Sequence, residues 1–225
     1  MRITHLGLRN WRTLKNLDVA LGERLIIVGA NASGKSNLLD SIRFIRDLTL
    51  DGGGLQQAVR DRGGISHLRC LYARNNNRGL VSVFVDLGDD ATKQVWRYEL
   101  SIKGEKGGLN RPIIASERVM FNGEVILDRP DEADRSDPDR LTQTALEQIS
   151  ANKDFRDIAD FFSATRYLHL VPQIIRDPGR GGDVANDPFG GDFIIRMYSA
   201  PARRRELWLR RITSTFVVMR RPVEG

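Results

Sequence analysis

This sequence predicts an α/β fold in which a mixed or antiparallel β-rich part is followed by a helical part. Three observations predict it. A short apolar run near residue 26 leads through a glycine-containing loop into a helical pattern, the segment from about 80 to 127 alternates apolar with polar residues, and helical patterns return beyond residue 140. With 225 residues the chain can hold one or two domains and a sizeable core.

The first 50 residues are expected to form strands, a loop and a helix. Residues 3–8 read as a strand, and so do residues 14–21, in which apolar side chains alternate. Residues 24–28 contain an unbroken apolar run, which is typical of a central strand covered on both faces, so we expect a third strand there. Apolar residues then recur at helical spacing from 38 to 45, and three consecutive glycines at 52–54 should end that helix.

The segment 51–128 is expected to be rich in β-structure. Residues 81–85 and 95–100 alternate apolar with polar side chains, as half-buried strands do. Asn122 and Gly123 form a dipeptide that favours the type I′ turn of a two-residue hairpin. We therefore expect antiparallel hairpins in this segment.

The remaining part, residues 139–215, is expected to be mainly helical. It follows a polar stretch, residues 129–140, which contains two prolines and reads as a loop. Residues 177–192 hold five glycines and two prolines and should form a connection rather than an element. Helical patterns, the last of them opened by a proline that suits a first helical turn, cover residues 141–150, 155–162 and 201–212.

The composition narrows the class of protein. A single cysteine, Cys70, can form neither an intramolecular disulfide nor a cysteine-based zinc site, and the three histidines are scattered. No apolar run approaches the roughly 18 residues of a membrane-spanning helix, and the N-terminus has no apolar segment of the secretory kind. We therefore expect a cytoplasmic protein without a membrane partner.

Residues 29–36 contain the motif that points to chemistry. They match the pattern G-x-x-x-x-G-K-[ST] at every fixed position, between an expected strand and an expected helix. Two glycines let the backbone wrap closely around phosphate oxygens, and the N-terminus of the following helix adds a positive field. The eight residues of this P-loop are Gly29, Ala30, Asn31, Ala32, Ser33, Gly34, Lys35 and Ser36.

The P-loop pattern predicts ATP and Mg²⁺ as ligands. The ammonium group of Lys35 is expected beside the β- and γ-phosphates, and the hydroxyl of Ser36 is expected to be a metal ligand. The alternative is a glycine-containing turn with a purely structural role.

The flanks of the P-loop point to a family. Residues 10–15, Asn-Trp-Arg-Thr-Leu-Lys, and residues 28–40 together resemble the N-terminus of RecF/SMC-type ABC ATPases, in which an N-[FW]-R element precedes a loop of the form G-x-N-x-[SA]-G-K-S-N-[LI]-[LI]-[DE]. The match is specific over residues 1–46, and beyond them only the order of a β-rich lobe and helices agrees. The resemblance implies an ABC-type head lobe in which Arg12 reaches the nucleotide phosphates and Asn37 supports the loop.

The same resemblance implies that ATP drives two heads together, so that the protein acts as a homodimer. The sequence also looks like the stand-alone ATPases of bacterial defence systems, which work with a nuclease or another effector. Without the resemblance, Arg12 reads as a surface residue of a strand, and that interpretation stays open.

Several motifs of an ABC-type head are not found. Such a head needs a Q-loop glutamine, a signature resembling L-S-G-G-Q, a Walker B run ending in Asp-Glu and a switch histidine. No signature is present in the sequence. Gln143, Gln148 and Gln173 are candidates for the Q-loop residue, although each is also typical of an ordinary helix or loop, and nothing singles out His67 or His169 as a switch.

Residues 125–132 look like a Walker B run, but their context argues against that role. They follow the Asn-Gly turn, they lie before the helical part, and Arg129 stands where the catalytic glutamate is expected. We interpret the match as coincidental, place Asp128 in a hairpin strand, and leave the catalytic residues unassigned. We therefore expect residues 1–225 to be a partial head that lacks its C-terminal, hydrolytic half.

The formal net charge of +6 is concentrated at the C-terminus. Eight arginines lie between residues 196 and 225 beside Glu206 and Glu224, so the rest of the chain is balanced. A basic helix of this kind could bind DNA phosphates, or it could be the solvated face of an amphipathic helix. The arginines are Arg196, Arg203, Arg204, Arg205, Arg210, Arg211, Arg220 and Arg221.

The sequence therefore favours a Mg²⁺-dependent ATPase that acts in DNA repair or recombination, or in antiphage defence. One alternative is a nucleotide-binding regulatory subunit that does not hydrolyse ATP. Another is a P-loop kinase or GTPase. The antiparallel region argues against a kinase, which has a parallel core, and the Asn-Lys-x-Asp guanine motif of a GTPase is not present.

Overall fold

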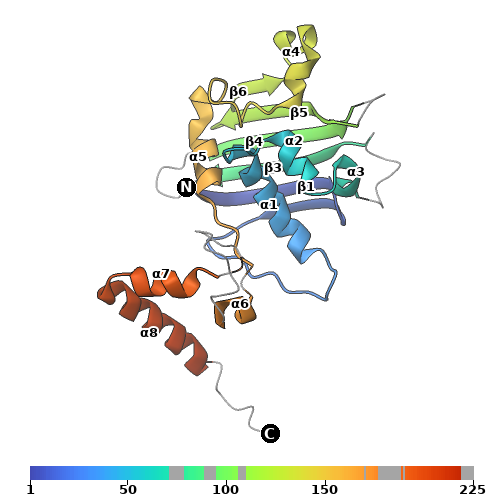
Figure 1. Ribbon diagram of the computed structural model, residues 1–225. Helices are drawn as coiled ribbons and strands as arrows, with labels where there is room; N and C mark the ends of the chain where they lie inside the picture. Colours follow the sequence, from blue (N-terminus) through green and yellow to red (C-terminus); the bar gives the residue numbers. More distant parts are fainter. Residues whose placement is uncertain are drawn as a thin grey trace. The chain divides into compact units, whose positions relative to one another are not determined.

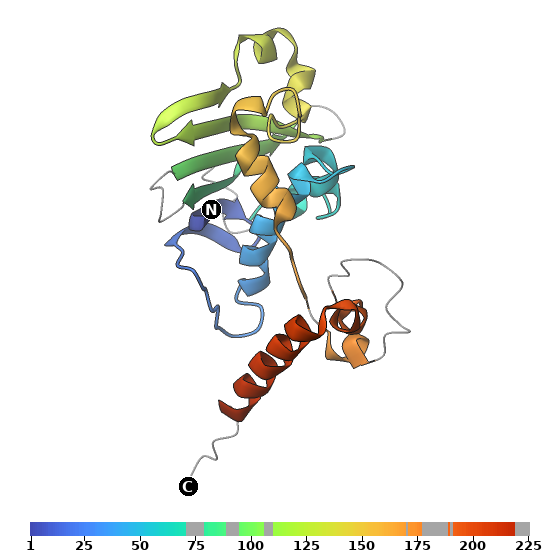
Figure 2. The same ribbon diagram turned by 90° about the vertical axis from the view of Figure 1, so that its left-hand side faces the viewer.

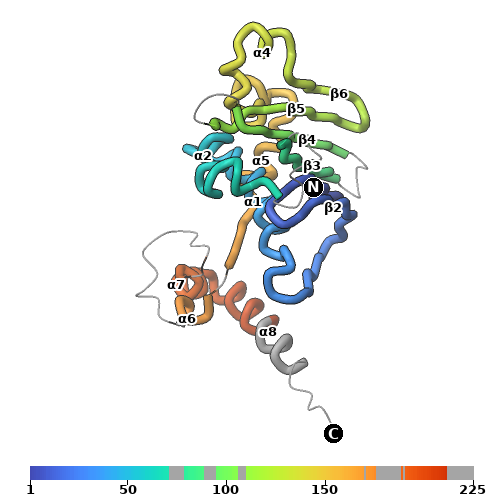
Figure 3. The backbone as a smooth tube through the Cα atoms, turned by 90° about the vertical axis from the view of Figure 1, so that its right-hand side faces the viewer, coloured from blue at the N-terminus to red at the C-terminus, as the bar shows by residue number. Residues whose placement is uncertain are grey.

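The computed structural model describes residues 1–70, 79–88, 95–105, 110–169, 171–176, 189 and 191–218. The chain folds into two compact units, the first from Met1 to Thr165 and the second from Arg166 to Gly225. The first unit contains a sheet with helices packed against it, and the second contains helices (Figures 1 and 3). Each unit is described by itself below.

The first unit is built on a six-stranded sheet in which every neighbouring pair is antiparallel. Its order is β2-β1-β3-β4-β5-β6, so β2 and β6 form the two edges. The expected strands at 3–8, 14–21, 81–85 and 95–100 are confirmed, and Asn122 and Gly123 form the turn between β5 and β6. The strands are β1 (Arg2–Trp11), β2 (Leu14–Ala20), β3 (Val81–Gly88), β4 (Val95–Gly104), β5 (Pro112–Phe121) and β6 (Glu124–Arg129).

Helices cover one face of this sheet, as Figures 1 and 2 show. The helix expected after the P-loop is confirmed as α1 and ends before the three glycines, and the pattern at 155–162 is confirmed as α5. Apolar side chains alternate along the strands and meet α1 through Phe44, Ile45 and Leu48, which are buried. The helices are α1 (Lys35–Thr49), α2 (Leu55–Arg60), α3 (Ile65–Leu68), α4 (Glu132–Ser136) and α5 (Arg156–Ala164).

The third strand expected at 24–28 does not form. The segment that enters the P-loop is irregular, and within the described chain it pairs with no strand. Its apolar side chains are largely in solvent, with Leu25 48%, Ile26 86% and Val28 87% exposed. The apolar pattern is that of a strand covered on both faces, whereas no strand of the six-stranded sheet pairs with this segment.

Two further expectations between residues 129 and 150 are wrong. The polar stretch forms α4, which Asp131 begins by accepting a hydrogen bond from the Asp134 N–H at 2.8 Å, and then a 3₁₀-helix over Pro138–Thr142. The helix expected at 141–150 is instead a series of turns. Its N–H groups at Ala145 and Leu146 donate to the buried carboxylate of Glu117 on β5, and this long-range acceptor replaces the helical hydrogen bonds.

The second unit holds the helices α6 (Pro172–Arg176), α7 (Phe193–Ser199) and α8 (Ala202–Val218). The last of these confirms the helix expected from Pro201, whose carbonyl accepts the N–H groups of Arg204 and Arg205. The expected connection at 177–192 falls largely outside the described residues. No helix among the residues that the structure describes is long and apolar enough to cross a membrane.

Candidate nucleotide-binding site

The P-loop adopts a backbone conformation that suits an anion. Ala32 and Gly34 have left-handed φ angles of 62° and 97°, and the Ser33 N–H closes a turn on the carbonyl of Ala30 at 3.3 Å. Glycine is required at position 34, because a Cβ atom there would lie 3.0 Å from Thr13 Oγ1 and 3.2 Å from Leu14 Cδ2. Left-handed residues alternating with right-handed ones turn successive N–H groups toward one concave side.

The first turn of α1 continues this surface of N–H groups. The helix begins at Lys35 after an N-cap, Gly34, that has no side chain to cap it. Its first intrahelical N–H donor is that of Leu38, which bonds to the Gly34 carbonyl at 3.1 Å. The three N–H groups before it have no intrahelical acceptor, so the positive end of the 15-residue helix is open to a negative group.

Lys35 lies across the P-loop. Its Nζ donates to the carbonyls of Gly29 at 2.8 Å and Ala30 at 2.7 Å, which leaves one of the three ammonium donors for another acceptor. The lysine thus fixes the start of the loop against the start of the helix. A phosphate that enters would compete with these two carbonyls for the ammonium group.

The hydroxyl of Ser36 is exposed at the beginning of α1. Within the described part of the chain it makes no hydrogen bond. A hydroxyl oxygen is the hard, neutral ligand that Mg²⁺ accepts beside water and phosphate oxygens. The residue type and its position one place after the lysine therefore fit a nucleotide-bound magnesium ion.

The turn between β1 and β2 holds the first turn of α1. The buried indole of Trp11 donates from Nε1 to the carbonyl of Asn37 at 2.9 Å, and the Asn37 amide donates to Thr13 Oγ1 at 2.7 Å. Trp11 also packs against Phe44, with ring centroids 5.2 Å apart. We call Trp11, Thr13 and Asn37 the α1 clamp. It fixes the direction in which the first-turn N–H groups point.

Arg12 lies beside the same helix but faces a carboxylate. Its Nε is 3.0 Å from Asp40 Oδ2, and Asp40 is also paired with the buried Arg62 at 3.1 Å. Asp40 lies one helical turn beyond Ser36, so the structure brings Arg12 close to the beginning of α1. Its guanidinium is engaged with α1 in this structure.

The Walker B lookalike occupies the opposite edge of the sheet. Asp128 is on β6, four strands from β1, or about 19 Å at a spacing of 4.8 Å. Its Oδ2 accepts from the Arg118 guanidinium at 2.8 Å, and both side chains are exposed. Sequence reasoning placed Asp128 in a hairpin strand, and the structure confirms that position.

Arg129, the residue after it, is a buried structural cation. Its Nη1 is 3.0 Å from Glu117 Oε2, and its Nη2 is 2.8 Å from Asp134 Oδ1. The Tyr98 hydroxyl donates to the same Glu117 carboxylate at 3.0 Å. Burial raises the pKa of Glu117, whereas hydrogen bonds from Arg129 hold the pKa of Asp134 well below its usual range.

Within the described first unit, Gln143, Gln148 and His67 form no hydrogen bond with the P-loop. Gln143 lines a cavity at the C-terminal end of α1, roughly 20 Å along the helix from Lys35. Gln148 is half-buried in the turns after it, and His67 is exposed on α3. The two others, Gln173 and His169, are exposed residues of the second unit.

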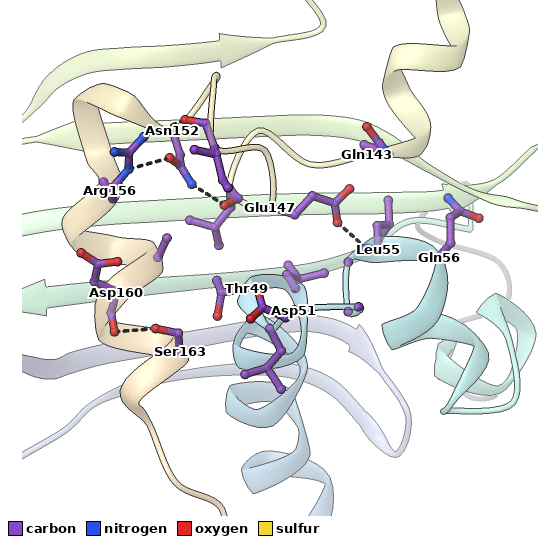
Figure 4. Close-up of a pocket in the computed structure, with 18 residues that line it drawn as sticks. Thr49, Asp51, Leu55, Gln56, Gln143, Glu147, Asn152, Arg156, Asp160 and Ser163 are labelled. Atoms are coloured by element: carbon purple, nitrogen blue, oxygen red, sulfur yellow. Dashed lines mark hydrogen bonds between the residues drawn. The ribbon is translucent and has the colours of Figure 1, made fainter.

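That cavity, of about 620 Å³, is a feature that sequence reasoning missed (Figure 4). Glu147 lines it and accepts the N–H groups of Leu55 at 2.6 Å and Thr144 at 3.0 Å. Burial raises the pKa of Glu147 to about 7, although both N–H groups favour the charged form. The Thr-x-x-Glu spacing of a capping box at 144–147 was the signal that could have indicated this residue.

A family model described as "AAA domain, putative AbiEii toxin, Type IV TA system" matches residues 25–210. The match includes the whole P-loop and continues from the first unit into the second. No curated protein matches the chain.

Proposed function

We propose that this chain, which belongs to the AAA-domain family described as a putative AbiEii toxin of type IV toxin–antitoxin systems, binds MgATP in its P-loop and takes part in ATP hydrolysis. The chain is a P-loop NTPase domain whose first unit has a six-stranded antiparallel sheet covered by helices. The binding of ATP and Mg²⁺ by particular residues is part of the proposal.

The observation that carries the proposal is the combination of loop and helix at residues 29–37. The left-handed residues of the loop, the three first-turn N–H groups and the Lys35 ammonium all belong to one short segment. Such a segment stabilises a phosphate chain by charge-assisted hydrogen bonds rather than by an apolar pocket. Ser36 would then hold the magnesium ion that accompanies the nucleotide.

Arg12 and Asn37 have supporting roles in this proposal. Asn37 positions the loop through the α1 clamp, as described above. Arg12 would release Asp40 and turn to the terminal phosphate when nucleotide enters, because both acceptors lie near the first turns of α1. The glycines and small residues of the loop leave room for phosphate oxygens.

We infer that turnover requires groups beyond those that the described residues supply. Hydrolysis needs a group that positions the attacking water and additional charge around the transferred phosphoryl. Within the described chain, no acidic side chain forms an ion pair or hydrogen bond with residues 29–36. A second head, brought by ATP into a homodimer of the RecF/SMC-like ABC type, would supply them.

The description of the family as a putative toxin of type IV toxin–antitoxin systems favours a role in antiphage defence over one in DNA repair. An effector partner is a further part of this proposal. The same lack of a carboxylate at the P-loop favours one other function, that of a nucleotide-binding regulatory subunit without hydrolysis. The two functions share the site and differ only in turnover.

The test is calorimetric titration of the chain with MgATP. Lys35→Ala removes a charge-assisted phosphate contact worth roughly 1.5 to 3 kcal/mol, so affinity should fall about ten- to hundredfold. Lys103→Ala is the matched control, because Lys103 is an exposed lysine of β4 in the same unit. Equal affinity of the parent and Lys35→Ala would contradict the assignment of the P-loop.

A further inference from the structure

Arg12 and Arg62 share one carboxylate, that of Asp40, but they hold it differently. Arg62 Nε donates to both Asp40 oxygens at 3.1 Å, and the Arg62 side chain is only 4% exposed. Arg12 Nε lies 3.0 Å from Asp40 Oδ2. This nitrogen is buried and, within the described chain, has no hydrogen-bond partner, so the two atoms are close without being aligned. Asp40 is therefore held firmly by Arg62 and loosely by Arg12.

The Arg62 guanidinium is fixed by more than Asp40. It donates from Nη1 to the carbonyl of Ala58 and from Nη2 to Asp47 Oδ2, both at 2.8 Å. It also lies over the ring of Phe44, 5.2 Å from the centroid. A buried arginine with this many partners keeps its place when one neighbour moves. Arg62 is therefore a fixed positive charge beside α1.

The backbone of Arg12, unlike its guanidinium, is tightly held. Arg12 has a left-handed φ of 48°, and its N–H donates to the carbonyl of Leu68 at 2.6 Å. A left-handed conformation is unfavourable for an arginine and persists only where the surrounding structure enforces it. Residues of this kind are frequent at ligand-binding sites. The fold thus anchors the backbone of a side chain whose charged end is loosely bound.

The turn that carries Arg12 borders the P-loop. A Cβ atom on Gly34 would lie 3.0 Å from Oγ1 of Thr13, the residue after Arg12. Asp40 lies four residues after Ser36 on α1, which is a rise of about 6 Å along the helix. From one backbone position, the Arg12 guanidinium therefore has both the Asp40 carboxylate and a phosphate in the P-loop within its surroundings.

The departure of Arg12 from Asp40 would be unfavourable without Arg62. The Asp40 side chain is only 18% exposed, and removing the partner of a largely buried charge leaves that charge uncompensated. Arg62 prevents this, because its two hydrogen bonds to Asp40 remain after Arg12 has left. The exchange then replaces an unaligned contact of Arg12 with charge-assisted hydrogen bonds to phosphate.

We propose that Arg62 is a positioning residue through which the site distinguishes ATP from ADP. It holds the charge of Asp40, so that Arg12 can exchange this carboxylate for the terminal phosphate of ATP, which ADP lacks. The inference rests on the proposed binding of nucleotide at the P-loop and adds selectivity for the terminal phosphate to it. Arg62 acts through Asp40 and Arg12 and does not itself touch the nucleotide.

The experiment is calorimetric titration of the full chain with MgATP and with MgADP, and the readout is the ratio of the two affinities. Arg62→Gln should lower the preference for ATP about fivefold, because Asp40 then retains Arg12. Asp40→Asn should raise the preference about threefold, because the competing carboxylate is removed. Asp40→Asn combined with Arg62→Gln should cancel the loss, and the affinity for MgADP should stay near the parental value throughout.

Two variants are matched controls. Arg97→Gln also removes an arginine that pairs with an aspartate, Asp86 at 2.6 Å, and lies over a phenylalanine ring, but it does so on the sheet. Asp47→Asn removes the other carboxylate of Arg62 and leaves Asp40 with its partner. Neither control should change the preference for ATP.

The outcomes separate this inference from the proposed function. Absence of MgADP and MgATP binding by the parent would contradict the proposed function, and this inference with it. If the parent binds both nucleotides and Arg62→Gln lowers the two affinities equally or not at all, the proposal is overturned and the P-loop assignment stands. Should Arg62→Gln fail to fold, Asp40→Asn decides alone, and a preference for ATP at or below the parental value would reject the proposal.

Discussion

At the scale of single residues, the P-loop segment shows which roles a sequence can predict. The pattern at 29–36 identified Gly34, Lys35 and Ser36, since a phosphate loop needs those residue types at that spacing. Nothing in the pattern indicated that Trp11 would donate to the carbonyl of Asn37, because that bond joins positions 26 residues apart. The N-W-R element drew attention to Arg12. The structure shows that its neighbour Trp11 also matters, because Trp11 donates a hydrogen bond to the first turn of α1.

We expect the α1 clamp to act on nucleotide affinity. Trp11→Phe keeps an aromatic ring against Phe44 but removes the indole N–H. The carbonyl of Asn37 then loses its hydrogen bond from residue 11. Stability should fall by about 1 to 2 kcal/mol. MgATP affinity should fall about five- to tenfold, because the first-turn N–H groups lose their fixed direction.

Phe44→Leu serves as the control for this prediction. It disturbs the same apolar cluster without removing a hydrogen bond, so chemical denaturation should show a comparable loss of stability while calorimetry shows unchanged MgATP affinity. If both variants bind MgATP as the parent does, the clamp has only a structural role.

At the scale of elements, the sequence predicted most accurately those strands, turns and helices that depend on interactions between residues close in sequence. The strands β1 to β4, the Asn-Gly hairpin and helix α1 follow from local periodicity and turn chemistry. The turns at 143–152 could not be predicted, because their N–H groups bond to Glu117, 28 residues away on β5. Residues 24–28 have the apolar pattern of a strand that is covered on both faces. The pattern alone does not determine which other segments would cover such a strand, and no described strand pairs with these residues.

Glu147 links the turns at 143–152 to the beginning of α2, and this link should depend on pH. Burial raises its pKa to about 7, above the value near 4.5 in the unfolded chain, so between these values the folded state binds more protons. Stability contributed by this group is therefore fully present below about pH 4.5 and is lost as the pH rises through 7.

Glu147→Gln should flatten this dependence, since glutamine does not titrate. The measurement is urea denaturation of both proteins at pH 5 and pH 7.5, in which the parent should lose more stability than the variant. Asp134 does not interfere, because its lowered pKa places its titration below this range. Parallel changes in the two proteins would show that Glu147 titrates at an ordinary pKa.

At the scale of the whole molecule, binding and turnover of ATP should separate. The P-loop offers binding groups, but within the described chain Asp40, the carboxylate nearest to it in sequence, is paired with Arg12 and Arg62. We therefore expect the purified chain to bind MgATP and release phosphate slowly. Asp128→Asn should leave that rate unchanged, because Asp128 lies on the far edge of the sheet.

Steady-state phosphate release measures this directly, with Lys35→Ala as the control for contaminating ATPases. A rise in specific activity with protein concentration would support assembly of two heads. Fast turnover that needs Lys35 and collapses in Asp128→Asn would identify residues 125–132 as a true Walker B run and refute the interpretation of β6.

The exposed apolar segment at residues 24–28 leads directly into the P-loop. The binding of a nucleotide to the loop and the pairing of a strand with this segment are therefore thermodynamically coupled. Among described residues, no N–H group between Gly22 and Ala32 donates a hydrogen bond, so the loop enters the site with few restraints. A nucleotide must therefore spend part of its affinity on fixing the loop. A strand that pairs with residues 24–28 fixes it beforehand, and by reciprocity each ligand must then raise the affinity of the other by the same factor.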